Sequence, residues 1–189
     1  MKSSLFILPI LILPWLAGCI GMPGQLSSSK SVFDGSREIR IEPAWVSQGW
    51  SPMSFKLGLY RNSNMESNRA MLVALGTENI SDGRSLKFNI DGEVIALESI
   101  DRVSEISSQG PNVFYSKRYE VDLALLKRLV TGSNVTARIE YFRSHEDGTF
   151  SKDDPFSARP AFRKFINAVE HPEILTVEKS PSPKVGGHR

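Results

Sequence analysis

Cysteine and histidine are scarce in this sequence of 189 residues, and neither sign of charge dominates. The single cysteine, Cys19, excludes an intrachain disulfide and a zinc site built from several cysteines. The three histidines lie too far apart to form a pair of metal ligands on one turn of a helix. Lysine and arginine number 23 and aspartate and glutamate 21, so the chain lacks the basic surplus typical of nucleic-acid-binding proteins. We therefore expect no nucleic-acid partner.

The sequence also lacks an apolar run long enough to cross a membrane. Its N-terminal run covers residues 5–20, which is shorter than the roughly 20 residues that a spanning helix needs. Pro9 and Pro14 interrupt this run, and each would remove a hydrogen bond from a helix. Because Lys2 places a positive charge just before the run, the segment has the layout of a secretory signal sequence.

The apolar run ends in Leu16-Ala17-Gly18-Cys19, an aliphatic residue followed by two small residues and a cysteine. This tetrapeptide resembles the lipobox that signal peptidase II recognises in bacterial lipoproteins. The resemblance covers residues 1–19 only, where a positive start, an uncharged apolar run and the box coincide. The alternatives are an ordinary signal sequence with a chance cysteine, or a free cysteine buried in the folded domain. The position of the only cysteine at the end of the run favours the lipoprotein.

The resemblance implies a covalent anchor. Residues 1–18 would be a signal peptide that is removed by cleavage between Gly18 and Cys19. The Cys19 thiol would then carry diacylglycerol, and its new amino group often receives a further acyl chain such as palmitate. Two or more acyl chains hold a protein stably on a membrane. In bacteria of the enteric type an aspartate after the cysteine favours the inner membrane, so Ile20 indicates the outer membrane, with the domain facing the periplasm.

Composition divides the rest of the chain into a tether, one domain and a tail. Residues 19–34 begin with the lipidated cysteine and are rich in serine, glycine and proline, which is typical of a flexible spacer. Residues 178–189 carry no apolar periodicity and are expected to be a disordered tail. Residues 35–177 have a length common for a single domain. With 40% hydrophobic and 23% charged residues, the chain has the composition of a globular protein.

Alternation of apolar and polar residues predicts β-strands in much of the domain. The strand at residues 37–42 is expected to stop at Pro43, which has no amide hydrogen to donate to a neighbouring strand. Residues 70–75 are all apolar, so periodicity leaves a buried strand and a short helix open. Further strands are expected at residues 54–59, 112–120 and 134–142.

The clearest local pattern is a β-hairpin formed by residues 85–90 and 93–98. Asp91-Gly92 between them suits a two-residue turn, because glycine adopts positive φ without steric cost. The resulting register pairs apolar residues on one face of the hairpin, Phe88 with Ile95 and Leu86 with Leu97.

Two helices are expected near the C-terminus. Asp122 can cap Leu123–Thr131, and Gly132 is expected to end that helix in a left-handed conformation. Ser157 can cap a second helix that carries a continuous apolar stripe, which we expect to pack on a sheet rather than form a groove for a partner. The stripe consists of Ala158, Ala161, Phe162, Phe165, Ile166 and Val169. The expected fold is therefore α+β: an antiparallel sheet of about six to eight strands with both helices packed on one face.

No sequence pattern assigns a catalytic residue, a metal site or a cofactor. Ser27 and Lys30 have the spacing of a serine–lysine catalytic pair but fall in the expected tether, where nothing would hold their geometry. Residues 145–148, His-Glu-Asp-Gly, are expected to form a turn whose carboxylates could bind calcium if the loop folded back. Their spacing does not match an EF-hand, so we favour a solvated turn.

Trp45 and Trp50 bracket a short polar segment and are the remaining candidate site residues. They could form a stacking surface for a sugar or a partner, although core packing is the favoured interpretation. The expected function is that of a lipid-anchored cell-envelope protein with a non-enzymatic role, which binds an envelope protein partner or is structural. The alternatives are a periplasm-facing module that binds a glycan or lipid, and a hydrolase whose residues meet only in the folded chain.

Overall fold

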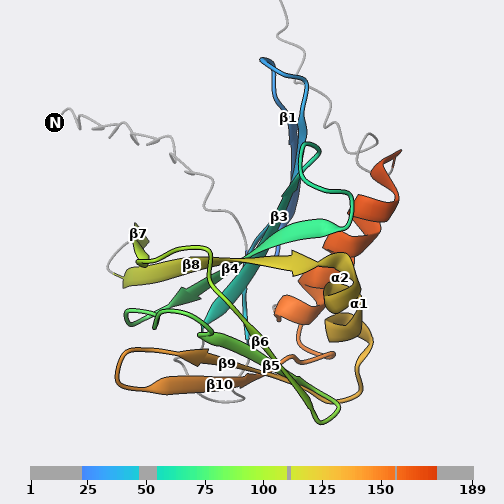
Figure 1. The fold of residues 1–189 in the computed structure, drawn as a ribbon. Helices are drawn as coiled ribbons and strands as arrows, with labels where there is room; N and C mark the ends of the chain where they lie inside the picture. The colour runs from blue at the N-terminus through green and yellow to red at the C-terminus, as the bar shows by residue number, and fades with distance from the viewer. Residues whose placement is uncertain (1–22, 47–54, 110–111, 156, 174–189) are drawn as a thin grey trace, which may run out of the picture.

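The computed structural model describes residues 23–46, 55–109, 112–155 and 157–173. Within these ranges the strands form two antiparallel sheets (Figure 1). Sheet A has six strands in the order β1-β2-β3-β4-β8-β7, and sheet B has four in the order β10-β9-β5-β6. The elements are β1 (Leu26–Lys30), β2 (Arg37–Trp45), β3 (Lys56–Asn62), β4 (Arg69–Gly76), β5 (Leu86–Ile90), β6 (Glu93–Leu97), β7 (Glu105–Gln109), β8 (Asn112–Asp122), α1 (Leu123–Thr131), β9 (Val135–Glu140), β10 (His145–Thr149) and α2 (Ala158–Glu170).

One apolar core joins both sheets and both helices. Helix α2 lies against β2, β3 and β1 of sheet A, and α1 lies beside α2 (Figure 1). Phe150 links sheet B to this layer, because its ring meets Phe88 of β5 and Phe162 of α2 edge-on, at centroid distances of 6.1 Å and 5.2 Å. Edge-on aromatic pairs at such distances are favourable beyond the area that they bury.

This architecture confirms the expected α+β class, although the strands are divided between two sheets rather than gathered in one. The apolar segment at residues 70–75, for which strand and helix were both open, forms the body of β4. Strand β4 lies between β3 and β8 inside sheet A, and most of its residues are buried on either face. A strand covered on both faces needs no polar alternation, which explains the continuous apolar run.

The predicted hairpin is confirmed as β5 and β6, with the expected register of Phe88 opposite Ile95. Asp91 and Gly92 both have positive φ, at 52° and 97°, as a two-residue hairpin turn requires. The Asn89 side chain supports the turn, because its Oδ1 accepts a hydrogen bond from the Gly92 amide at 2.9 Å.

The expected flexible spacer is wrong for residues 26–30, which form β1 and pair with β2. The pairing runs from Leu26 opposite Ile41 to Lys30 opposite Arg37. Strand β1 lies at the edge of sheet A, and its residues after Leu26 are exposed. Its serine-rich sequence is therefore compatible with a strand, because beyond Leu26, which packs against the core, the strand contributes mainly its backbone pairing with β2.

The expected end of β2 at Pro43 is also wrong, because the strand continues to Trp45. The register between β2 and β3 shifts between Ile41 and Ala44. This irregularity is where a strand tolerates proline, since one residue of a bulge leaves the ladder of hydrogen bonds.

Helix α1 lies where the sequence predicted it, but the residues at its two ends, Asp122 and Gly132, do not have the roles that were expected of them. Asp122 is at the N-cap without a side-chain capping bond, and its carboxylate instead pairs with Arg69 at 3.1 Å. Gly132 has φ of −50°, so it is not left-handed. Glycine is needed at position 132 because there is no room for a side chain. A Cβ there would lie 2.8 Å from a side-chain carbon of Val135 and 2.9 Å from one of Ile90.

Helix α2 begins as predicted, with the Ser157 hydroxyl accepting from the Arg159 amide. The predicted stripe faces the core, where Ala158, Ala161, Phe162, Phe165 and Ile166 are buried and Val169 is partly buried.

Arg159 of α2 was not predicted to be buried, yet only 2% of it is exposed. Its guanidinium donates hydrogen bonds to the carbonyls of Val130, Gly132 and Phe150. Val130 and Gly132 stand at the end of α1, where carbonyls have no partner within the helix. Arg159 therefore caps α1 from α2, and its burial lowers the pKa of the guanidinium from the usual range.

Candidate functional site

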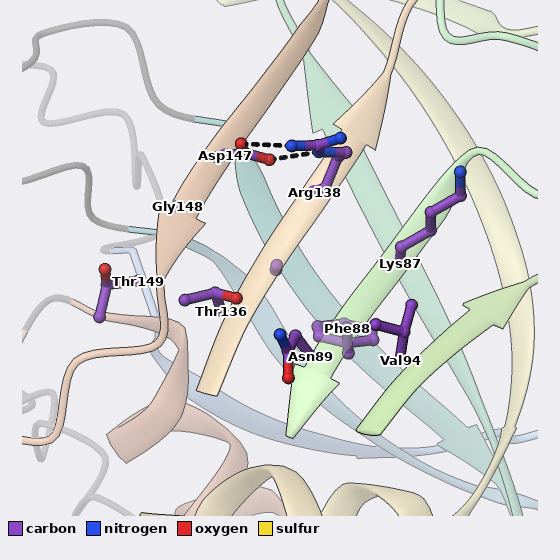
Figure 2. A pocket seen from close by; sticks show the side chains of 10 residues that line it. Lys87, Phe88, Asn89, Val94, Thr136, Arg138, Asp147, Gly148 and Thr149 are labelled. Atoms are coloured by element: carbon purple, nitrogen blue, oxygen red, sulfur yellow. Dashed lines mark hydrogen bonds and ion pairs between the residues drawn. The ribbon is translucent and has the colours of Figure 1, made fainter. Parts of the chain in front are cut away.

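A hollow of about 530 Å³ lies on the outer face of sheet B, on the side away from the core. Figure 2 shows the side chains around it, which come from all four strands of the sheet or from their ends. Strand alternation explains this arrangement, since Phe88 points into the core and its neighbours point outward. The lining residues are Lys87, Phe88, Asn89, Val94, Thr136, Ala137, Arg138, Asp147, Gly148 and Thr149.

A charged row crosses three strands along one side of the hollow. The register places Lys87 of β5 opposite Arg138 of β9, and Arg138 opposite Asp147 of β10. Arg138 holds Asp147 through two hydrogen bonds, Nε to Oδ1 at 2.6 Å and Nη2 to Oδ2 at 2.7 Å (Figure 2). Lys87 Nζ pairs with Glu140 Oε1 at 2.5 Å. Each cation of the row is thus matched by one carboxylate.

The Arg138–Asp147 pair also fixes the protonation of both groups. The guanidinium lowers the pKa of Asp147, and the carboxylate raises the pKa of Arg138. Both side chains are about half exposed, so the pair adds little to the free energy of unfolding. Its main effect is to hold the two side chains in a fixed position. A carboxylate held in this way is a weak proton acceptor, which makes it suited to hydrogen bonding rather than general base catalysis.

A second row, next to the first, carries neutral polar groups. Asn89 lies opposite Thr136, Thr136 lies opposite Thr149, and Val94 completes the row on β6. Among the described residues, the hydroxyls of Thr136 and Thr149 form no hydrogen bond. The side chain of Val94 is 64% exposed and provides an apolar border. The hollow therefore combines free hydroxyls, paired charges and one apolar edge, a set that can bind an uncharged ligand rich in hydroxyl groups.

The two tryptophans predicted as a possible binding surface have different outcomes. Trp45 ends β2 and is partly buried, and Lys56 Nζ lies 4.3 Å from the centroid of its ring. The same Nζ lies 4.7 Å from the ring of Phe114, so the lysine sits between two aromatic side chains. Burial lowers the pKa of Lys56. Trp50 lies outside the described residues, as do Gly18 and Cys19.

The expected solvated turn at residues 145–148 is wrong, because these residues belong to β10 and the connection to β9 lies before them. Alternation in β10 sends Asp147 to the hollow and Glu146 to the other face, where it accepts a hydrogen bond from the Tyr141 hydroxyl at 2.9 Å. Burial raises the pKa of Glu146. Within the described ranges, no three metal-binding side chains lie close enough together to hold an ion.

Reasoning from the sequence did not predict the hollow, although the alternation in the predicted hairpin indicated which of its side chains point outward. The predicted hairpin already placed Lys87 and Asn89 on the face opposite Phe88. The pairing of β5 with β9 was not predictable, because it joins segments separated by all of β6, β7, β8 and α1.

Comparison with known protein families, curated proteins and solved structures found no match to this chain. Among the described residues, neither helix has the length and apolar character needed to cross a membrane.

Proposed function

We propose that this chain is a lipid-anchored cell-envelope protein with a non-enzymatic role, held by acyl chains on Cys19 at the outer membrane and facing the periplasm. The tetrapeptide Leu16-Ala17-Gly18-Cys19 at the end of the apolar run carries the proposal, and the described structure begins only a few residues after it. The Gly24 amide donates to the Glu42 carbonyl at 3.0 Å, and β1 begins at Leu26. The chain from Cys19 to Gly24 spans at most about 18 Å. An anchor at Cys19 would hold the edge of sheet A close to the membrane.

Exposed apolar side chains on β7 and β8 support a partner-binding role. Ile106 is 68% exposed on β7, which is the edge strand of sheet A opposite β1. Val113 of β8 is 49% exposed and points to the same face as Ile106. An edge strand with exposed apolar side chains can bind an extended segment of another protein through backbone hydrogen bonds. The partner that we propose is therefore another protein of the envelope.

Replacing Cys19 with serine is expected to abolish incorporation of radiolabelled palmitate and to leave the protein either uncleaved or soluble in the periplasm. The serine hydroxyl cannot form the thioether that the lipobox chemistry requires. The wild-type protein should sediment with the outer membrane in a density gradient. As a matched control, Ser27→Cys in the Cys19→Ser chain restores a cysteine outside the box and should not restore labelling. Absence of palmitate from the wild-type protein contradicts the anchor.

The hollow on sheet B favours a second candidate function, which is binding of a glycan. Its charges are paired, so an ionic ligand gains little there, whereas the hydroxyls of Thr136 and Thr149 can bond to a sugar. Uncharged sugars present many hydroxyls and apolar C–H faces, which match these groups and Val94.

Titration with triacetylchitotriose is expected to shift the backbone amide resonances of Asn89, Thr136 and Thr149. Thr136→Val keeps the shape of the side chain and removes its hydroxyl, so binding should weaken by about tenfold, or ~1.4 kcal/mol. Thr131→Val on α1 is the control and should leave the affinity unchanged. Shifts that spread evenly over the protein, or an affinity that is unchanged in the Thr136→Val variant, contradict a site in the hollow.

A further inference from the structure

Two adjacent apolar side chains stand almost fully in solvent at the tip of the β1–β2 hairpin. Val32 is 91% exposed and Phe33 is 98% exposed. The hairpin projects from the rest of the molecule, on the side away from sheet B (Figure 1). Large apolar side chains that are exposed together at one projecting point indicate a site of contact with a protein or a membrane.

The tip is held in one shape by its own polar residues. The Ser31 hydroxyl accepts hydrogen bonds from the amides of Phe33 and Asp34, at 3.2 Å and 3.3 Å. The Asp34 carboxylate accepts from the Ser36 amide at 3.0 Å and from Asn64 Nδ2 at 3.3 Å. Hydrogen bonding to the Ser31 hydroxyl, and then to the amide and hydroxyl of Ser36, lowers the pKa of Asp34 to about 2, so its carboxylate keeps these bonds at physiological pH. Phe33 is thus presented in solvent by an ordered turn, which reduces the entropy that binding costs.

Two cations stand directly behind the apolar tip. Lys30 and Arg37 face each other in the last pair of the β1–β2 ladder. Arg37 is further positioned by a hydrogen bond from its Nη1 to the Pro172 carbonyl at 3.1 Å. An apolar end followed by basic side chains reproduces the order of layers at a membrane surface, where hydrocarbon lies beneath anionic phosphates. Asp34, the carboxylate of the turn, is directed to Asn64 on the neighbouring β3–β4 connection.

The proposed anchor and the tip can reach the same membrane. Cys19 lies within about 18 Å of Gly24 at the maximal reach of the chain. Phe33 lies at most about 30 Å from Gly24 at the rise of an extended strand. A hairpin inclined to the membrane satisfies both lengths, with the acyl chains and Phe33 entering one leaflet.

We propose that Val32 and Phe33 insert into the bilayer that holds the acyl chains of Cys19, while Lys30 and Arg37 bind lipid phosphates. The inference rests on the lipid anchor of the proposed function. Two points of attachment fix the orientation of the domain, which a single flexible anchor cannot do. In this orientation sheet B lies on the side of the molecule away from the inserted tip (Figure 1).

The test uses the full lipidated chain with one added thiol. Because Cys19 is the only cysteine and the proposed thioether to diacylglycerol occupies its sulfur, Phe33→Cys provides a unique position for a nitroxide spin label. Phe142→Cys is the matched control, because Phe142 is also a phenylalanine, is 72% exposed and lies on the connection between β9 and β10 of sheet B, away from the β1–β2 hairpin (Figure 1). Each labelled protein is placed in vesicles of phosphatidylethanolamine and phosphatidylglycerol that contain no other protein.

The label at position 33 is expected to lose contact with a water-soluble nickel chelate and to gain contact with oxygen, at a depth of roughly 5–10 Å. The label at position 142 should remain accessible to the chelate. Charge reversal by Lys30→Glu and Arg37→Glu should raise the label at position 33 toward the water. Equal chelate access at positions 33 and 142 in vesicle-bound protein overturns the insertion and leaves the anchor intact. A chain that takes up no palmitate overturns the anchor and the insertion together.

Discussion

Replacing Arg159 with methionine is expected to lower the free energy of unfolding by about 3–5 kcal/mol. The guanidinium is buried, and it donates to Val130 O at 3.1 Å and 3.2 Å, to Phe150 O at 3.3 Å, and to Gly132 O. Methionine fills a similar volume and has no donor. Several carbonyls would then be buried without a partner, at a cost of about 1–3 kcal/mol each before the structure relaxes.

Urea denaturation measures this loss, and the same helix offers a matched control. Arg163 is one turn further along α2 and is exposed. Arg163→Met should change the free energy of unfolding by no more than about 0.5 kcal/mol. Equal midpoints for the Arg159 and Arg163 variants would show that the cap on α1 contributes nothing. Lysine at position 159 should rescue only part of the loss, because an ammonium lacks the planar fork that reaches several carbonyls.

Replacing Phe165 with alanine is expected to cost about 3–5 kcal/mol, the usual range for emptying a buried phenylalanine site. Phe165 has 0% exposure on the face of α2 that meets sheet A. The loss is a large part of the roughly 5–15 kcal/mol by which domains are stable. Helix α2 carries both this side chain and Arg159, so each test probes its attachment by different chemistry: cavity formation here and lost hydrogen bonds there.

Thermal melting of the Phe165→Ala protein tests the packing, with Lys164→Ala as the control. Lys164 is the neighbouring residue on the exposed face of the same helix. Its replacement should leave the melting temperature nearly unchanged, because it removes no buried contact. A Phe165→Ala protein that melts with the wild type would contradict the role of α2 as the cover of sheet A.

Local patterns were sufficient where the chain pairs with itself over a short distance. The β5–β6 register follows from the two-residue turn at Asp91 and Gly92, so counting outward from the turn places Phe88 opposite Ile95. The stripe of α2 was likewise readable, since a helix repeats its apolar positions whatever it packs against. These predictions needed no knowledge of other parts of the fold.

The errors concern residues whose partners are distant in the sequence. The serines of β1 resemble a linker because the strand contributes backbone bonds to β2 and few buried side chains. Arg159 has a residue type that is typical of surfaces, and only the end of α1, brought close by the fold, explains its burial. The hollow depends on the pairing of β5 with β9, which places Asn89 beside Thr136. Residue type and periodicity carry no information on such pairings.

The order in which the chain is made gives the position of α2 a further consequence. The helix that covers sheet A is the last described element, and it supplies Phe162 and Phe165 to the core. A growing chain without α2 leaves the apolar face of sheet A uncovered and the end of α1 without Arg159. Stable folding must therefore wait until residues beyond 158 have been synthesised. Such a delay keeps the chain unfolded until its final helix is available to cover sheet A.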